Sequence, residues 1–269
     1  MKNRQAFTQF NPSGTWVVPG QALRFKDQTV PVTVSLEPGH QAFDLALTTD
    51  DPRSLFFKGH AFVDGDWVYT MTSDNLGHTT LRVYDVGADQ MDGVTVYKNL
   101  GYQHAVRKDK APGDPVAGNW KLKGINADGS NYDAELIVTK LGDHYSLTSI
   151  DAGGSKHEGV AFLSGTKLVG CTVTSLSVRT SRKLVATGDG LYLNERTRTS
   201  ENEAHFVLGA YHNEAGVLRG SSLYGSNEAE DMNREQEKLL VAEWTQHGAA
   251  APTAAAPAPP AAPATAAAP

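Results

Sequence analysis

Apolar and polar residues alternate along much of the chain with the two-residue period of a β-strand that buries one face. One alternating row spans residues 30–36 and, after a Pro-Gly turn, a second spans 43–47. A similar pair spans 132–138 and 145–147, joined by Leu-Gly-Asp. Two alternating rows joined by a short turn predict a β-hairpin at each place.

The same alternation predicts further strands in both halves of the chain. They span residues 66–72, 79–86, 92–99, 166–174, 182–188, 190–195, 204–211 and 216–225. Each half thus supplies roughly seven or eight short strands, as in an up-and-down barrel or a sandwich. We expect closed barrels, because closure removes exposed sheet edges.

The two halves repeat the same landmarks in the same order. Gly-x-Trp-x-x-x-Gly occurs at 14–20 and again at 118–124, and "GHAFVDG" from Gly59 matches "GVAFLSG" from Gly159. Matching landmarks with slightly different offsets indicate a duplication followed by loop changes. We therefore predict one β-barrel at 12–110 and a second at 111–225, joined by the proline-containing segment "KDKAPGDPVAG".

The period changes after the second copy. Ser226 or Asn227 can cap a helix, acidic residues follow, and Met232, Gln236, Leu239, Leu240 and Trp244 recur at helical spacing. An amphipathic helix is predicted at 226–248. The segment 249–269 contains only Ala, Pro and Thr, so we expect a disordered Ala/Pro-rich tail.

Composition narrows the classes of partner and the compartment. The formal net charge is -6 and no long Lys/Arg cluster occurs, so nucleic acid is not an expected partner. No segment approaches the roughly 18 apolar residues of a membrane span, and the N-terminus has no apolar run typical of a signal peptide. A cytoplasmic protein is expected, although a leader already removed would leave the same sequence.

No residue pattern predicts a catalytic, metal or cofactor site. The nine histidines are scattered, and only His205 and His212, along one predicted hairpin, are candidates to come close. Gly-x-Ser-x-Gly, P-loop and dinucleotide-binding motifs do not occur in the sequence. Asp64 and Asp66 flank Gly65 as turn residues do, and the single cysteine, Cys171, lies in an apolar run typical of a buried thiol.

Aromatic residues in the predicted strands are candidates to line a ligand cavity, with core packing as the alternative. A few polar residues, His60 among them, would fix the orientation of a ligand. The candidate ligand-binding residues are Trp67, Tyr69, Arg82, Tyr132, Tyr145, Phe206, Tyr211 and Arg219. Whether Arg219 faces inward depends on the strand register, because a shift of one residue reverses the face.

The Gly-x-Trp motif at the start of each repeat, followed by a meander of short strands, resembles the lipocalin-like barrels of the calycin group. The resemblance implies that Trp16 and Trp120 close one end of each barrel. The pattern from Gly118 to Tyr224 is similar to bacterial domains described as fibronectin-binding-protein-like. The expected fold class is therefore all-β, with two tandem antiparallel lipocalin/avidin-like β-barrels, a C-terminal helix and a disordered tail. The Thr-Asp-Tyr motif that lipocalins often carry is missing from the sequence.

Three hypotheses of function remain open at this point. The first is a non-enzymatic protein that binds a small apolar or amphipathic molecule in a barrel. The second is an interaction or scaffold protein with filled barrels, whose outer faces contact a protein partner. The third is an enzyme like the lipocalin-like cyclases or hydratases, although no acid/base pair supports it. A homo-oligomer is compatible with each hypothesis.

Overall fold

The computed structural model describes residues 10–25, 28–38, 42–49, 57–73, 79–97, 99–109, 111, 113–174, 181–187, 190–196, 205–226 and 239–246. All regular elements in these ranges are β-strands, which confirms the predicted all-β class. The first half contains β1 (Gly14–Phe25), β2 (Gln28–Pro38), β3 (Phe43–Thr49), β4 (Phe57–Asp64), β5 (Trp67–Ser73), β6 (Thr79–Val86), β7 (Gln90–Tyr97) and β8 (Asn99–Arg107). The second half contains β9 (Gly118–Ile125), β10 (Asn131–Leu141), β11 (His144–Asp151), β12 (Lys156–Ser164), β13 (Lys167–Thr174), β14 (Ser181–Thr187), β15 (Gly190–Arg196), β16 (His205–Glu214), β17 (Val217–Ser226) and β18 (Leu239–Gln246).

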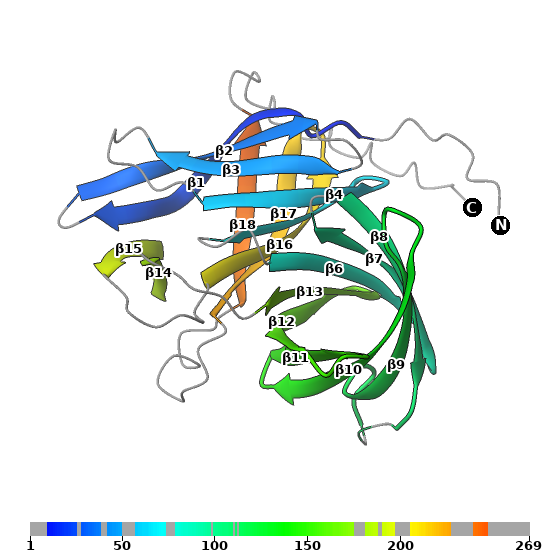
Figure 1. Cartoon of the computed structure of the whole chain (residues 1–269). Coiled ribbons are helices and arrows are strands. Elements are labelled where there is room, and N and C mark those ends of the chain that lie inside the picture. Colours follow the sequence, from blue (N-terminus) through cyan, green and yellow to red (C-terminus); the bar gives the residue numbers. More distant parts are fainter. Residues whose placement is uncertain are drawn as a thin grey trace, which may run out of the picture.

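Antiparallel hydrogen bonding closes two barrels of eight strands each, as predicted. Barrel 1 contains β1–β5 and β16–β18, and the pairing of β1 with β2 closes it. Barrel 2 contains β6–β13, closed in the order β10-β11-β12-β13-β6-β7-β8-β9. The hairpin β14–β15 is attached to barrel 1 through a parallel pairing of β15 with β1. In Figure 1, barrel 1 therefore combines blue and cyan strands with yellow and orange ones, whereas barrel 2 is teal to green.

The boundary between the repeats does not separate the barrels. The predicted unit 12–110 contains β1–β8, but β1–β5 belong to barrel 1 and β6–β8 to barrel 2. The second repeat extends beyond its predicted end at residue 225 to include β18, and in it β9–β13 belong to barrel 2 while β16–β18 return to barrel 1. Each barrel thus takes five strands from one repeat and three from the other. The two repeats exchange their last three strands.

Strand registers show that the exchanged strands occupy matching places. In barrel 1, Trp16 of β1 lies opposite Gln246 of β18. In barrel 2, Trp120 of β9 lies opposite Arg107 of β8. Strands β16, β17 and β18 therefore complete barrel 1 as β6, β7 and β8 complete barrel 2. The eight strands of one barrel therefore correspond one to one with those of the other, whereas the hairpin β14–β15 has no counterpart among the described strands of barrel 2.

The predicted helix at 226–248 is wrong where the structure describes it, because residues 239–246 form β18. This strand pairs with β17 on one side and with β1 on the other. Without β18, barrel 1 would have two unpaired strand edges. The apolar residues of 239–246 therefore help to close the barrel. Trp244 faces the interior, where its ring lies 4.2 Å from that of Tyr211. Residues 227–238, which hold most of the predicted helix, and the predicted disordered tail at 249–269 lie outside the described residues.

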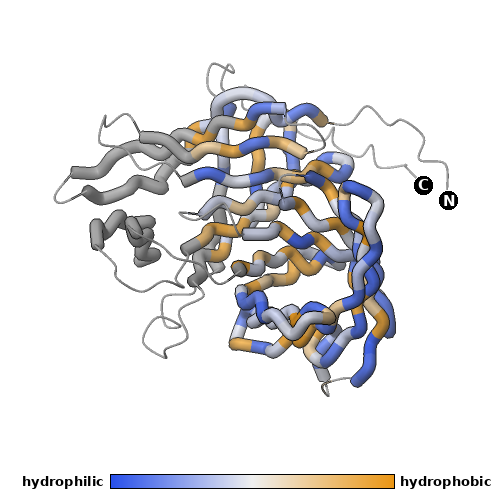
Figure 2. Tube along the Cα trace, in the orientation of Figure 1, coloured by the Kyte–Doolittle hydropathy of each residue, from blue (hydrophilic) through white to orange (hydrophobic). Residues whose placement is uncertain are grey.

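Three apolar cores hold the barrels, one inside each barrel and one between their outer faces. The alternation of apolar and polar positions that separates inside from outside is visible along the strands in Figure 2. The core between the barrels contains Tyr69, Met71, Phe206, Leu208, Ala210 and Leu223 from barrel 1, and Leu81, Val83, Val94, Val96, Val160, Phe162, Val169, Cys171 and Val173 from barrel 2. The strands that meet there are therefore apolar on both faces, as in an interior sheet.

The two repeated tryptophans have the same environment in the two barrels. Both side chains are fully buried. The indole nitrogen of Trp16 donates to the carbonyl of Pro12 at 2.8 Å, and that of Trp120 donates to the carbonyl of Val116 at 3.0 Å. Each tryptophan thus fixes the segment four residues before it against the barrel interior. The closing role that the resemblance implied for the two tryptophans stays a prediction.

One lysine links the two barrels electrostatically. The Nζ atom of Lys167 in barrel 2 lies 2.8 Å from Asp64 of barrel 1 and 2.8 Å from Asp85 of its own barrel. Burial acts to lower the pKa of Lys167, but the two carboxylates outweigh it and raise the pKa. The ammonium therefore remains charged and joins the barrels at the edge of their shared apolar core.

The strand exchange predicts which engineered disulfide will form. Lys167 and Asp85 are register partners across β13 and β6, so the pair Lys167→Cys and Asp85→Cys should form a disulfide. In barrels without exchange, Lys167 would instead face the position matching Asp85, which is His212. We expect peptide mapping under oxidising conditions to find the first disulfide. Efficient formation of a disulfide between the two introduced thiols of a Lys167→Cys, His212→Cys variant would contradict the exchange.

The matched tryptophans predict similar losses of stability. Trp16→Ala and Trp120→Ala should each lower the free energy of unfolding by roughly 3 to 5 kcal/mol, because each leaves a large cavity. Urea denaturation of the full chain measures the loss, with the exposed Tyr102→Ala as a control expected to change it by less than about 0.5 kcal/mol. A change as small as the control's at either tryptophan would exclude the closing role there.

Candidate functional site

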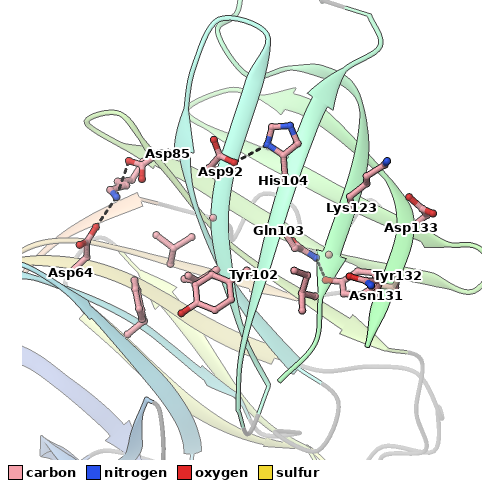
Figure 3. Close-up of a pocket in the computed structure, with 17 residues that line it drawn as sticks. Asp64, Asp85, Asp92, Tyr102, Gln103, His104, Lys123, Asn131, Tyr132 and Asp133 are labelled. Carbon is pink, nitrogen blue, oxygen red and sulfur yellow. Dashed lines mark hydrogen bonds and ion pairs between the residues drawn. The ribbon is translucent and has the colours of Figure 1, made fainter. Parts of the chain in front are cut away.

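A hollow of about 690 Å³ lies on the outer wall of barrel 2, where β6–β10 face β4 of barrel 1 (Figure 3). We call it the inter-barrel groove. It is lined by Phe62, Asp64, Val83, Asp85, Asp92, Gly93, Val94, Tyr102, Gln103, His104, Lys123, Gly124, Ile125, Asn131, Tyr132, Asp133 and Lys167. Because the neighbouring positions Leu122 and Ala105 face the barrel core, Lys123 and His104 face outward. The groove is therefore outside the barrel.

The groove has an apolar strip with unusually exposed side chains. Tyr102 is 53% exposed and Ile125 is 48% exposed, and they are register partners across β8 and β9. Val94 of β7 lies opposite Tyr102 on the other side and continues the strip into the core between the barrels. Phe62 extends the same apolar surface from barrel 1. Exposed apolar surface of this kind is typical of binding sites.

Charged residues flank the apolar strip on two sides. His104 and Asp92 form a pair at 2.7 Å, and Lys123 lies opposite both His104 and Asp133 in the strand register. The other flank is the Asp64–Lys167–Asp85 link between the barrels (Figure 3). The arrangement can hold an apolar or aromatic body on the strip and hydrogen-bond its polar end at the rim.

Inside barrel 2, directly behind the groove wall, polar side chains form a buried network. Arg82 donates from Nε to Thr172 at 3.0 Å, and from Nη1 to Gln103 at 3.0 Å and to the Tyr84 hydroxyl at 3.3 Å. Gln103 also accepts from Tyr84 and donates to Tyr132. The structure therefore brings together the predicted site residues Arg82 and Tyr132.

The wall between this network and the groove is thin because two glycines face inward. A Cβ atom at Gly124 would lie 2.1 Å from the Tyr132 ring, and one at Gly93 would lie 2.5 Å from the Tyr84 ring. Only glycine allows the two tyrosine rings to lie against the wall. Gln103 and Tyr132 consequently belong both to the buried network and to the groove lining.

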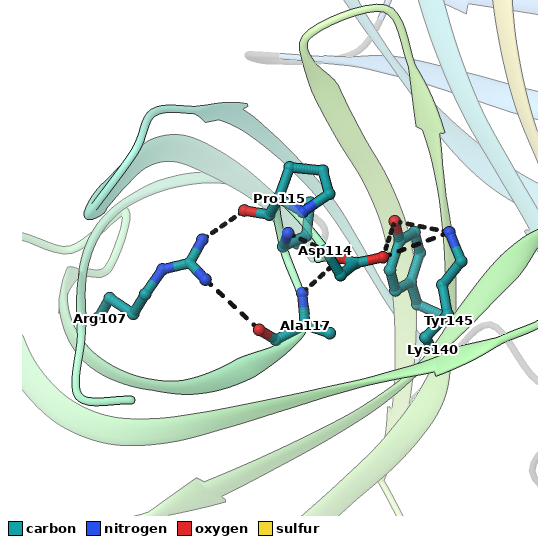
Figure 4. Close-up of polar contacts among 7 residues, drawn as sticks. Arg107, Asp114, Pro115, Ala117, Lys140 and Tyr145 are labelled. Atoms are coloured by element: carbon teal, nitrogen blue, oxygen red, sulfur yellow. Dashed lines mark hydrogen bonds and ion pairs between the residues drawn. The ribbon is translucent and has the colours of Figure 1, made fainter. Parts of the chain in front are cut away.

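Tyr145 also faces the interior of barrel 2, but it lies at the end opposite the Arg82 network. The segment 113–117 covers that end (Figure 4). Its hydroxyl donates to Asp114 at 3.2 Å and accepts from Lys140 at 3.1 Å. Burial acts to raise the pKa of Asp114, but amide hydrogen bonds from Ala117 and Val116, together with Lys140, outweigh it and lower the pKa. These contacts fix the covering segment.

Arg107 strengthens the same closed end. Its guanidinium lies 4.2 Å from the Trp120 ring and donates to the carbonyls of Pro115 and Ala117 (Figure 4). The end of barrel 2 that contains Tyr145 and Trp120 is thus filled and sealed, and Tyr145 has a structural environment there.

Several predicted ligand-binding residues do not face a barrel interior. Tyr69 and Phe206 lie in the core between the barrels, and Trp67 packs against it and stacks on Tyr69 at 6.2 Å. Strand residues alternate between faces, so the neighbours Val68 and Thr70, not Tyr69, belong to the inner face of barrel 1.

The remaining candidates are divided between the core and the surface. Tyr211 lies inside barrel 1 beside Trp244. Arg219 faces outward, where it pairs with Glu214 at 2.9 Å and Glu243 at 2.8 Å. Buried His60 lies 3.5 Å from Asp44, also away from the groove. These residues do not form one site with Arg82 and Tyr132.

The sequence interpretation missed the groove because β8 reverses the usual alternation. Tyr102, His104 and Val106 face outward, while Gln103 is buried among inward positions. A strand with apolar residues outside and an amide inside does not have the pattern that predicts a buried face. The available signal was the row "GYQHAVR" itself, in which every second residue from Tyr102 is large and the residues between them are small or amide-bearing.

The histidines and the cysteine do not form a reactive cluster in the described part of the chain. His205 and His212 are both on β16, seven residues apart, which corresponds to roughly 23 Å along a strand. Within the described ranges no group of three or more His, Cys, Asp or Glu side chains is arranged to hold a metal ion. Burial raises the pKa of Cys171, which lies in the core between the barrels.

Among the described segments, no helix is long and apolar enough to cross a membrane. The chain matches no protein-family model, and no curated protein or solved structure is significantly similar to it. The proposals for the inter-barrel groove and the Arg82 network therefore depend on the geometry and chemistry of these two sites.

Proposed function

We propose that this protein binds a small amphipathic molecule, without transforming it, in the inter-barrel groove. The observation that carries the proposal is the exposed pair Tyr102 and Ile125 on the floor of a hollow of about 690 Å³. Ligand pockets usually have volumes of roughly 300 to 1,000 Å³ and combine an apolar lining with a few polar groups. The groove has both properties.

The apolar strip supplies the favourable free energy of binding. A ligand that covers Tyr102 and Ile125 removes apolar surface from water, which stabilises by about 25 cal/mol per Å². The Tyr102 ring adds a face for stacking on a flat ligand. The core between the barrels keeps Val94 and Phe62 in place beneath the ligand, so the floor is formed before binding.

The charged rim would orient the ligand. At one flank His104 and Asp92 offer a donor and an acceptor, and Lys123 offers an ammonium group. At the other flank the Lys167 ammonium is already shared by two carboxylates, so this flank is the more rigid one. An amphipathic ligand therefore has its polar end toward His104 and Lys123.

The groove replaces the barrel interior as the preferred ligand site. Inward-facing residues of barrel 2 form a packed core that includes Tyr84, Leu122, Leu136 and Leu147. Such a core stabilises the barrel but leaves the apolar surface of Tyr102 and Ile125 uncovered. The packed half of barrel 2 toward Trp120 agrees with the scaffold hypothesis of filled barrels. Two serine variants separate a ligand groove from a wider protein-contact surface.

Ile125→Ser should weaken binding of the amphipathic fluorophore 1-anilinonaphthalene-8-sulfonate by about five- to tenfold. Loss of a half-exposed isoleucine removes roughly 1 to 1.5 kcal/mol of apolar burial. Val106→Ser is the matched control, because Val106 is also 48% exposed and lies on β8 but does not line the groove. It should change the affinity less than twofold.

Native mass spectrometry of protein purified from its own source tests the same proposal for the natural ligand. We expect an excess mass that denaturation releases and that Ile125→Ser reduces. Equal losses of fluorophore binding in both serine variants, with no excess mass, would contradict the groove and favour the protein-contact surface of a scaffold.

A further inference from the structure

The two barrels differ in one respect that the duplication does not explain. Arg82 of barrel 2 lies opposite Gly170, and the matching position of barrel 1 is Gly209, opposite Thr70. Gln103 lies opposite Gly93, and the matching position of barrel 1 is Ala242, opposite Gly220. Barrel 2 therefore has a guanidinium and an amide where barrel 1 has a glycine and an alanine. A barrel of this design closes without the charged network.

Arg82 is buried without a carboxylate to balance its charge. The residue is 7% exposed, and its hydrogen bonds go to neutral acceptors on Thr172, Tyr84 and Gln103. Among the described residues, no Asp or Glu forms an ion pair with it. Burying a charge is unfavourable by several kcal/mol unless an opposite charge compensates it, so the network has the chemistry of an anion site.

The single positive charge of the Arg82 network favours a ligand that carries a single negative charge. His157, on the mouth side of the network, has a pKa lowered by burial and by the positive charge of Arg82, so it is neutral near pH 7. Asp151 lies 3.9 Å from His157, and its side chain is the more exposed of the two. Arg82 thus supplies the positive charge, while the Thr172 hydroxyl, the Tyr84 hydroxyl and the Gln103 amide are its neutral neighbours inside the barrel.

The barrel interior sets the direction from which a ligand reaches Arg82. Toward the closed end, the packed core around Leu122 and Leu147 fills the space as far as Trp120. Toward the other end, the next inward positions on β11 and β12 are Asp151 and His157, whose side chains are 43% and 25% exposed. An anion therefore enters past His157 with its charged end first.

We infer that Arg82 anchors the carboxylate of a monoanionic organic acid in the mouth of barrel 2, with the rest of the acid directed outward past His157. Nε and Nη1 of Arg82 already donate to Thr172, Tyr84 and Gln103, so a carboxylate oxygen would accept from Nη2 or replace one of these neutral acceptors. This site and the inter-barrel groove lie on opposite faces of one wall, since Arg82 is on the inner face and Tyr102 and Ile125 are on the outer face, and Gln103 belongs to the lining of both.

Isothermal titration calorimetry of the full chain with hexanoate, hexan-1-ol and hexylamine tests the inference. Hexanoate should bind at least tenfold more tightly than the alcohol or the amine of the same length. Inorganic sulfate, a dianion, should not displace hexanoate at the same concentration, because one of its two negative charges would stay uncompensated beside a single guanidinium. Equal binding of hexanoate and hexan-1-ol, no binding of hexanoate, or displacement by sulfate would each overturn the assignment.

Gln103→Glu is the decisive variant, because it keeps the shape of residue 103 and puts a carboxylate where Gln103 Oε1 lies, 3.0 Å from Arg82. The internal carboxylate should lower hexanoate affinity at least tenfold and leave the melting temperature unchanged or higher. Arg219→Gln is the matched control, since it changes the net charge by the same amount at an exposed pair and should leave hexanoate binding unchanged.

Two further variants complete the test. If the Arg82→Gln variant folds, it should also lose hexanoate binding. If that variant does not fold, the hexanoate affinity of Gln103→Glu decides the test. Ile125→Ser, which alters the groove, should leave unchanged the part of hexanoate binding that depends on Arg82. Undiminished hexanoate binding by Gln103→Glu, or the same loss in Arg219→Gln, would show that Arg82 is not the anchor.

Discussion

The hydrogen bonding of β5 with β16 and of β13 with β6 is the constraint on which the rest of this structure depends. In each of these two pairings a strand of one repeat is hydrogen-bonded to a strand of the other repeat. Neither repeat therefore closes a barrel by itself. The Arg82 network follows directly from this exchange. Arg82 and Gln103 come from the first repeat, and Thr172 and Tyr132 come from the second.

The exchange also determines how the barrels lie against each other. The chain passes from β5 of barrel 1 to β6 of barrel 2, and the outer faces near these strands share one apolar core. Burial of side chains such as Met71, Phe162 and Phe206 stabilises this contact. The Lys167 link at its edge fixes the position of β4 beside barrel 2 and so forms one flank of the groove.

The two barrels share the contacts of a buried tryptophan and have different interiors. Trp16 and Trp120 make the same indole-to-carbonyl hydrogen bond four residues back, which shows that the closed end follows one design. At the other end, barrel 2 has Arg82 and Gln103 where barrel 1 has Gly209 and Ala242. The outer wall of barrel 2 has the groove. Most of the features proposed for ligand binding therefore lie on barrel 2, and barrel 1 contributes Phe62 and Asp64 to the groove.

The sequence by itself determined the all-β class, most strands, the duplication and the two repeated tryptophans, because these depend on local alternation and on matching landmarks. The tertiary structure decided which strands pair, since hydrogen bonds between distant strands leave no local pattern. It also decided that residues 239–246 form β18, because closure of barrel 1 outweighs a helical spacing of apolar residues. The facing of Tyr69 and the reversed alternation around Gln103 depended on register, where a shift of one residue exchanges the inside and the outside of a barrel.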